Sequence, residues 1–195
     1  MSQNFYEIVR KIKNLLSSIG IYNSDVYSER CAKKYIEGKI TDLNIFLEFD
    51  YRIKDLEERI KNKLPKDYID FIKDHNGKAS GYGEWLFIED IQLATEYDIQ
   101  EYQIIEECPE LLSKKDLKSM IPIYTDNDSY VLLDLRENGK GVFVIWSDEI
   151  ELGFQAKNFE EFKELMIAYA TSADERGKEL IECNFFNFEQ DEDID

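Results

Sequence analysis

Apolar residues recur with the period of an α-helix along the first part of the chain. The pattern is clearest over residues 3–19, where one face carries Phe5, Ile8, Val9, Ile12, Leu15, Leu16 and Ile19. Gly20 ends the predicted helix. Weaker periodic patterns predict further helices over 25–37 and 50–62, whereas residues 41–49 fit either a short helix or a buried strand.

A helix with a defined start and stop is predicted over residues 64–77. Pro65 suits the first helical turn, where its missing N–H is not needed. The side chains of Tyr68, Phe71 and Ile72 share one face because they are spaced at i, i+3 and i+4. Asn76-Gly77 supplies left-handed residues that terminate the helix.

The second half of the chain changes to the pattern of strands. We expect strands over 84–88, 121–124, 130–135, 141–146 and 151–155. Pro122 predicts an edge strand, and Asn138-Gly139 predicts a hairpin. Asn158 caps a final helix to about residue 173. The order predicts an α+β fold with N-terminal helices, a central antiparallel twisted sheet of about 4–6 strands, and a C-terminal helix packed on the sheet.

Charge is high and unevenly spread. The chain has 24 basic and 42 acidic residues, a net charge of −18. Between Ala79 and Ser113 there are nine acidic residues and no Lys or Arg. Such a surface repels phosphate backbones, so direct nucleic-acid binding is not expected. The acidity either steers a basic protein partner or serves solubility alone.

The base-free segment contains the first candidates for a partner-facing surface. Tyr82 is the aromatic residue that we expect to be exposed and to anchor an interface. The acidic candidates in the same segment are Glu84, Glu89, Asp90, Glu96 and Asp98. A second acidic cluster, in a predicted hairpin loop, comprises Asp148, Glu149 and Glu151. A solvated face with no partner is the alternative for each acidic residue.

The sequence contains few residues in the patterns typical of catalytic or redox sites. His75 is the only histidine, and we place it near a helix C-terminus, where a partial positive charge is favourable. Three scattered cysteines without a CxxC pair predict reduced thiols: Cys31, Cys108 and Cys183. The glycines of residues 77–83 lack the strand, helix and Lys-Ser/Thr of a phosphate-binding loop. We therefore expect no enzyme activity and no cofactor.

One spacing is similar to a calcium loop. Asp126 and Asp128 are followed by Glu137 at the distance found in an EF-hand. Tyr130 and Val131 occupy positions that require an oxygen ligand and a glycine, so a turn and a strand are the better interpretation. We expect no metal.

Membrane and secretory segments are not predicted. The chain has no apolar run of about 18 residues, and its first residues lack a basic patch followed by an apolar block. We expect a cytoplasmic protein without a membrane partner.

Residues 50–172 resemble the SUKH superfamily, of the Smi/Knr type. The most specific part is Asp55-Leu56-Glu57-Glu58, followed by the helix over 64–77. Downstream, the strand that ends in Asp134 and the run Asn158-Phe159-Glu160-Glu161-Phe162 look like the family's later elements. The family usually has glycines before that strand, whereas this chain has Asp126-Asn127-Asp128-Ser129.

The resemblance implies binding without catalysis. It suggests an immunity protein that binds and neutralises a cognate bacterial polymorphic or contact-dependent toxin domain. A basic nuclease would suit the acidic charge. The alternative is a regulatory adaptor or scaffold of the same fold. We divide the chain into a helical extension (1–49), a SUKH-like domain (50–175) and an acidic, partly disordered tail (176–195). The sequence does not predict the oligomeric state.

Overall fold

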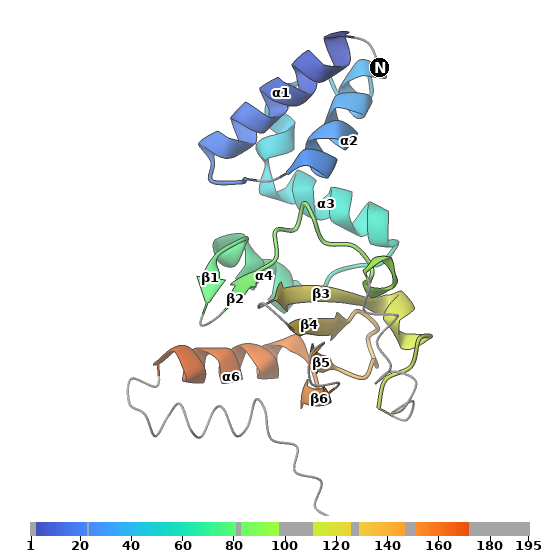
Figure 1. Ribbon diagram of the computed structural model, residues 1–195, viewed down its shortest axis with the longest axis vertical. Coiled ribbons are helices and arrows are strands. Elements are labelled where there is room, and N and C mark those ends of the chain that lie inside the picture. The colour runs from blue at the N-terminus through green and yellow to red at the C-terminus, as the bar shows by residue number, and fades with distance from the viewer. Residues whose placement is uncertain are drawn as a thin grey trace, which may run out of the picture.

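The computed structural model describes residues 3–22, 24–80, 83–97, 111–125, 129–146 and 151–171. Two helices and a short 3-10 helix come first: α1 (Gln3–Ser18), α2 (Asp25–Ile36) and η1 (Leu43–Leu47) (Figure 1). Residues 41–49, which in sequence fit either a short helix or a buried strand, therefore contain a helix. The carboxylate of Asp42 begins η1 by accepting the Asn44 N–H at 2.9 Å.

These first elements enclose a core of their own. Apolar side chains of α1, α2 and η1 pack on one another because each helix has an apolar face. The buried members are Phe5, Ile8, Val9, Ile12, Leu16, Ile21, Tyr27, Cys31, Ala32 and Phe46. We call residues 3–47 the helical extension.

Two further helices connect the extension to the sheet: α3 (Phe49–Ile60) and α4 (Lys66–His75). Pro65 is the N-cap of α4, and Gly77 has the left-handed φ of +65° that was expected after this helix. The prediction that Asn76 is also left-handed is wrong, since its φ is −52°. Its side chain instead makes hydrogen bonds with Ile88 and Glu89.

The sheet has six strands in the described residues, all antiparallel and in sequence order from β1 to β6. The strands are β1 (Ala79–Ser80), β2 (Gly83–Trp85), β3 (Met120–Thr125), β4 (Ser129–Asp134), β5 (Val142–Trp146) and β6 (Glu151–Ala156). With the helices before and after it, this meander makes the fold α+β, as predicted.

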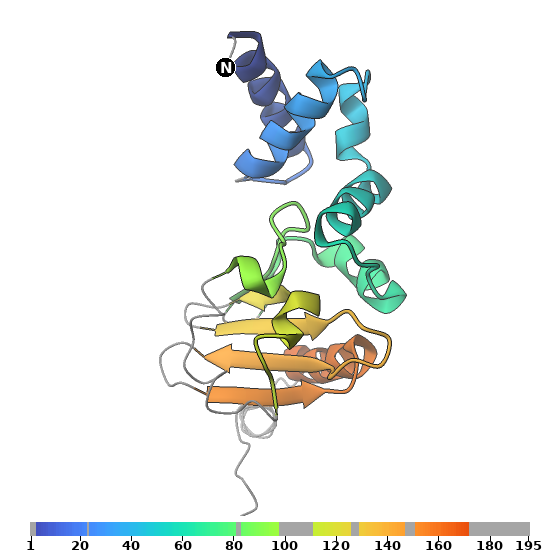
Figure 2. The ribbon, with the colours of Figure 1, turned by 90° about the vertical axis from the view of Figure 1, so that its right-hand side faces the viewer.

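Both faces of the sheet are covered (Figure 2). Side chains of α3, α4 and α6 (Phe159–Thr171) share one apolar core with β3, β4 and β5. The 3-10 helices η2 (Ala94–Glu96) and η4 (Asp116–Ser119) contribute to a second cluster on the other face. Both clusters are possible because neighbouring residues of a strand point to opposite faces.

The prediction that Pro122 marks an edge strand is wrong. β3 lies between β2 and β4. The proline is tolerated because β2 pairs only with Tyr124 and Thr125, and the β3–β4 register shifts between Pro122 and Tyr124. Pro122 therefore lies at an irregular part of an inner strand, beyond the pairing with β2.

The buried apolar residues of the extension and of the sheet domain belong to separate clusters. The division at residues 49 and 50 stays a prediction, and the tail over 176–195 lies outside the described residues. None of the helices in the described part of the chain is long and apolar enough to cross a membrane.

Replacing Gly77 with alanine should destabilise the protein more than the same change at Gly38. Both glycines have a left-handed φ, +65° and +70°, so each alanine costs about 1 kcal/mol for the backbone. An added Cβ at Gly77 would also lie within about 2 Å of the Phe87 ring, whereas Gly38 has open space around it. We expect Gly77→Ala to lower the free energy of unfolding by at least about 1 kcal/mol more than Gly38→Ala in urea denaturation. Equal losses would contradict the packing of Phe87 on Gly77.

Candidate partner-binding surface

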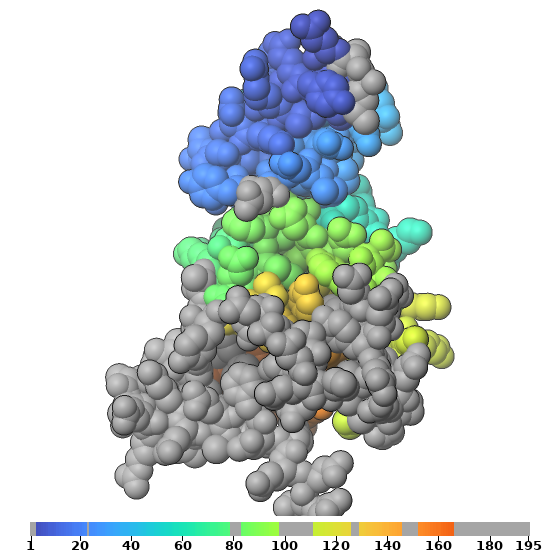
Figure 3. Space-filling model, in the orientation of Figure 1, coloured from blue at the N-terminus to red at the C-terminus, as the bar shows by residue number. Residues whose placement is uncertain are grey.

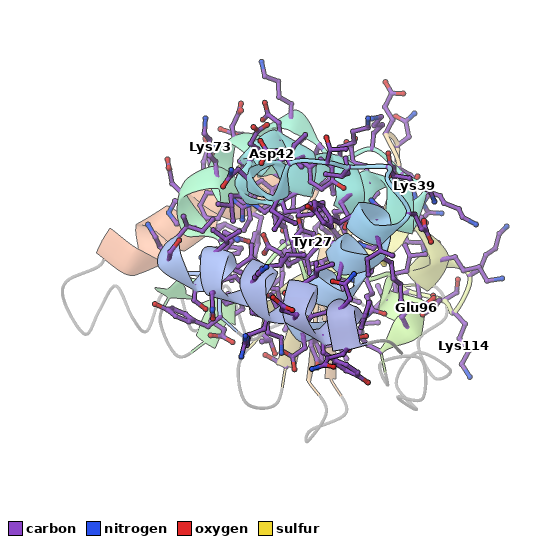
Figure 4. All side chains as sticks on the ribbon, turned by 90° about the horizontal axis from the view of Figure 1, so that it is seen from above. Tyr27, Lys39, Asp42, Lys73, Glu96 and Lys114 are labelled. Carbon is purple, nitrogen blue, oxygen red and sulfur yellow. The ribbon has the colours of Figure 1, made fainter. Side chains whose placement is uncertain are left out.

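Two of the predicted acidic residues are exposed. Glu84 lies in β2, where it pairs with Ala79 and Thr125. Its side chain is exposed, while the next residue, Trp85, is buried in the core. Glu96 lies in η2 and is also exposed; Figure 4 places it at the periphery of the molecule, away from the buried Tyr27. Both residues stay candidates for a partner-facing surface.

Glu89 is not on the surface. It is only 1% exposed, and Arg52 donates to its Oε1 at 2.5 Å. Asn76 Nδ2 donates to the other carboxylate oxygen at 3.2 Å, and Asn76 Oδ1 accepts the Ile88 N–H at 2.8 Å. Glu89 therefore joins α3, the end of α4 and the segment after β2. The prediction that Glu89 faces a partner is therefore wrong, and its carboxylate has a structural role.

Asp90 is half-buried next to this pair. Burial, together with the charge of Glu89, raises its pKa to about 6, although Arg30 and Arg59 act in the opposite direction. The carboxylate of Asp90 therefore ionises close to neutral pH in the folded protein.

The structure does not describe the side chains of the other five candidates. Tyr82, Asp98, Asp148 and Glu149 lie outside the described residues. Glu151 begins β6, where it pairs with Trp146, and only its backbone is described. Their role at an interface stays a prediction.

Asp55 is a buried charged residue that is not among the predicted partner-binding residues. It is 3% exposed and accepts from Lys34 at 2.8 Å, Arg30 at 3.2 Å and Arg59 at 3.2 Å. Burial opposes its charge, but the hydrogen bond from Lys34 and the nearby cations outweigh burial and lower the pKa of Asp55. The i, i+4 spacing to Arg59 is visible in the sequence, whereas the contacts with α2 are not.

The segment with Glu89 and Asp90 lies directly beneath the extension. On the face shown in Figure 3, residues 83–97 lie against the helices formed by the first residues of the chain. Arg30 of α2 also donates to the backbone carbonyl of Glu89 at 3.1 Å. The base-free segment therefore obtains cations from other parts of the same chain.

A second charged cluster organises the β4–β5 hairpin. The side chain of Asp134 is 0% exposed, and its carboxylate accepts the backbone N–H groups of Arg136 (3.0 Å) and Lys140 (2.9 Å). The Arg136 guanidinium bridges Asp134 and Asp116. A Cβ on Gly139 would lie 2.5 Å from the Asp134 carboxyl carbon, so a glycine is needed there.

A groove of about 370 Å³ borders this hairpin. Its walls include Leu64-Pro65 before α4, Asp134 and Arg136 of the hairpin, and Asn158 at the start of α6. Residues that carry the family resemblance thus meet in one place. The hydrogen bonds of Asp134 are made within the hairpin, so this side chain stabilises the turn.

The described residues contain no group of three or more His, Cys, Asp or Glu that could hold a metal ion. Cys31 is fully buried, and burial raises the pKa of its thiol to about 12, which makes it a poor nucleophile. His75 Nδ1 lies 2.8 Å from the Phe71 carbonyl oxygen, and its ring stacks on Phe71. Asp126 and Asp128 lie outside the described residues.

The fold and these contacts define an α+β domain with a helix, a Leu-Pro start to the next helix, and an Asp-ended strand. The model of the SMI1 / KNR4 family (SUKH-1) matches residues 50–164. The chain belongs to this family, as the sequence resemblance indicated. Comparisons with curated proteins and with solved structures find no match.

Replacing Asp134 with alanine should destabilise the fold strongly. The change leaves two backbone N–H groups without their acceptor, and the Arg136 guanidinium keeps only Asp116. We therefore expect a loss of about 2–4 kcal/mol in the free energy of unfolding. Asp42→Ala is the matched control, because this exposed carboxylate caps one short helix and should cost about 1 kcal/mol. Similar losses for the two variants in urea denaturation would refute the role of Asp134.

Asp90 should make stability depend on pH. Between its ordinary pKa of 3.8 and its folded value of about 6, the folded protein holds a proton that the unfolded chain has released. The resulting stabilisation is complete below 3.8 and is lost as pH rises through about 6.

Asp90→Asn should therefore raise the free energy of unfolding by about 1–2 kcal/mol near pH 8, after allowance for solvent screening, and by little near pH 4. Glu84→Gln, the same type of change on the surface, should have little effect at either pH. A gain from Asp90→Asn that is equal at both pH values would contradict the buried, ionised carboxylate.

Proposed function

We propose that this chain is a non-catalytic immunity protein that binds and neutralises a cognate toxin domain. Its membership of the SUKH-1 family over residues 50–164 carries the proposal. Bacterial proteins of this superfamily are largely immunity proteins that act by binding. The toxin would block the growth of cells that lack the immunity protein.

The charge supports a basic partner. The chain has a net charge of −18, and its exposed acidic residues include Glu84 and Glu96. A nuclease domain carries a basic groove for its phosphate substrate, and an acidic protein can occupy such a groove. A basic nuclease is therefore our proposed class of toxin, and the cytoplasm, where such a toxin would act, is the proposed location.

Co-expression with the product of the neighbouring gene tests this function. We expect the gene product alone to stop growth, and we expect this chain to restore growth and to co-purify with it. A catalytically inactive toxin variant should still form the complex, because the proposed inhibition is by binding. Failure to bind and failure to restore growth would together reject the proposal.

A regulatory adaptor of the same fold is the second candidate. Large exposed apolar residues support it, because most of those in the described chain lie in the helical extension, outside the family match: Tyr6, Ile19, Tyr22, Val26 and Ile36. An adaptor should bind several partners and lack a toxin gene beside its own. Affinity purification of the full chain would distinguish the two functions by the number of specific partners.

Reversing the charges of Glu84 and Glu96 to lysine should slow association with the basic partner several-fold at low salt. The effect should shrink as added salt screens the charges. Asp70→Lys with Asp74→Lys is the control, because it makes the same change in net charge on exposed residues of α4. Equal association rates for the two double variants, measured by stopped flow, would place the interface elsewhere.

A further inference from the structure

The helical extension and the sheet domain are joined by few apolar contacts. Their buried residues form separate clusters. From the domain side, the described apolar side chains that pack on the core of the extension are Tyr51 and Phe87, both only partly buried. An independent core allows the extension to keep its structure when it moves as a unit.

The chain connection between the two units is short. Glu48 is both the last capping residue of η1 and the N-cap of α3, and its backbone is extended, with φ −68° and ψ 128°. A single extended residue between two helical segments can act as a hinge, since small changes in its dihedral angles redirect the whole extension.

Ion pairs hold the extension in its observed position. Arg30 and Lys34 lie one turn apart on α2, and both reach the carboxylate of Asp55 on α3. Arg30 also donates to the Glu89 carbonyl. The side chains of Arg30 and Lys34 are 24% and 28% exposed, so water and salt ions reach both cations.

We propose that the helical extension is a hinged cap, latched to the sheet domain by Arg30 and Lys34, which opens as one body about Glu48. Opening exposes the carboxylate of Asp55 and the Glu89 carbonyl, both of which α2 covers in the closed state. Because Arg30 and Lys34 are partly exposed, added salt screens the latch and favours the open state. This opening does not depend on which protein the chain binds.

Carboxylate labelling of the full chain with a carbodiimide and an amine, read by mass spectrometry, tests the latch. Asp55 is 3% exposed when the cap is closed. Raising NaCl from about 0.05 M to about 0.5 M should increase its labelling rate at least about fivefold. The rate is normalised to Asp70, an exposed carboxylate of α4. Amide hydrogen exchange in α1 should not change with salt.

Two double variants complete the test. Arg30→Gln with Lys34→Gln should give fast labelling of Asp55 at both salt concentrations. Lys33→Gln with Lys39→Gln removes the same charge from exposed positions and should behave like the unmodified chain. Labelling of Asp55 that depends on neither salt nor the latch residues would overturn the proposal. Faster exchange in α1 under the opening conditions would also overturn it, because the extension would then be unfolding rather than opening.

Discussion

The buried ion pair between Arg52 and Glu89 is the contact on which the rest of the arrangement depends. A carboxylate that is 1% exposed is unfavourable unless a cation and further donors compensate for its lost hydration. Arg52 supplies the charge and Asn76 supplies the second donor. Because these groups come from α3, from the end of α4 and from the segment after β2, satisfying one carboxylate fixes three parts of the fold.

This contact changes how the acidic character of the chain should be understood. The segment from Ala79 to Ser113 has no basic residue, yet Glu89 is paired with Arg52, and Arg30 and Arg59 act on Asp90. Part of the negative charge is therefore used within the fold. A basic partner would meet the exposed carboxylates instead, and Glu84 and Glu96 are the described examples.

Local patterns predicted most of the secondary structure. The helices, the β4–β5 hairpin and the α+β class follow from periodicity and turn residues, which depend on neighbours in sequence. The prediction of an edge strand from Pro122 was wrong, because strand order is set by packing across the whole sheet. The proline is accommodated at a register shift within an inner strand. The prediction of a left-handed Asn76 was also wrong, and its side chain makes hydrogen bonds with Ile88 and Glu89.

The candidate surface was harder to predict than the fold. Exposure decides whether an acidic residue can meet a partner, and exposure depends on residues far away in sequence. Glu84 could be placed outward by its alternation with Trp85, which is a local property. The burial of Glu89 could not be foreseen, because its cation lies 37 residues earlier. The pairing of the buried Asp55 could not be foreseen for the same reason, since α2 provides two of its partners.

A double-mutant cycle on Arg52 and Glu89 tests the central claim, that this pair holds the fold together. The free energy of unfolding would be measured for Arg52→Met, for Glu89→Met and for the double variant. Each single variant should lose about 3 kcal/mol or more, because it leaves a buried charge unpaired. The double variant should lose much less than the sum, with a coupling of at least about 2 kcal/mol. Losses that simply add would contradict the claim.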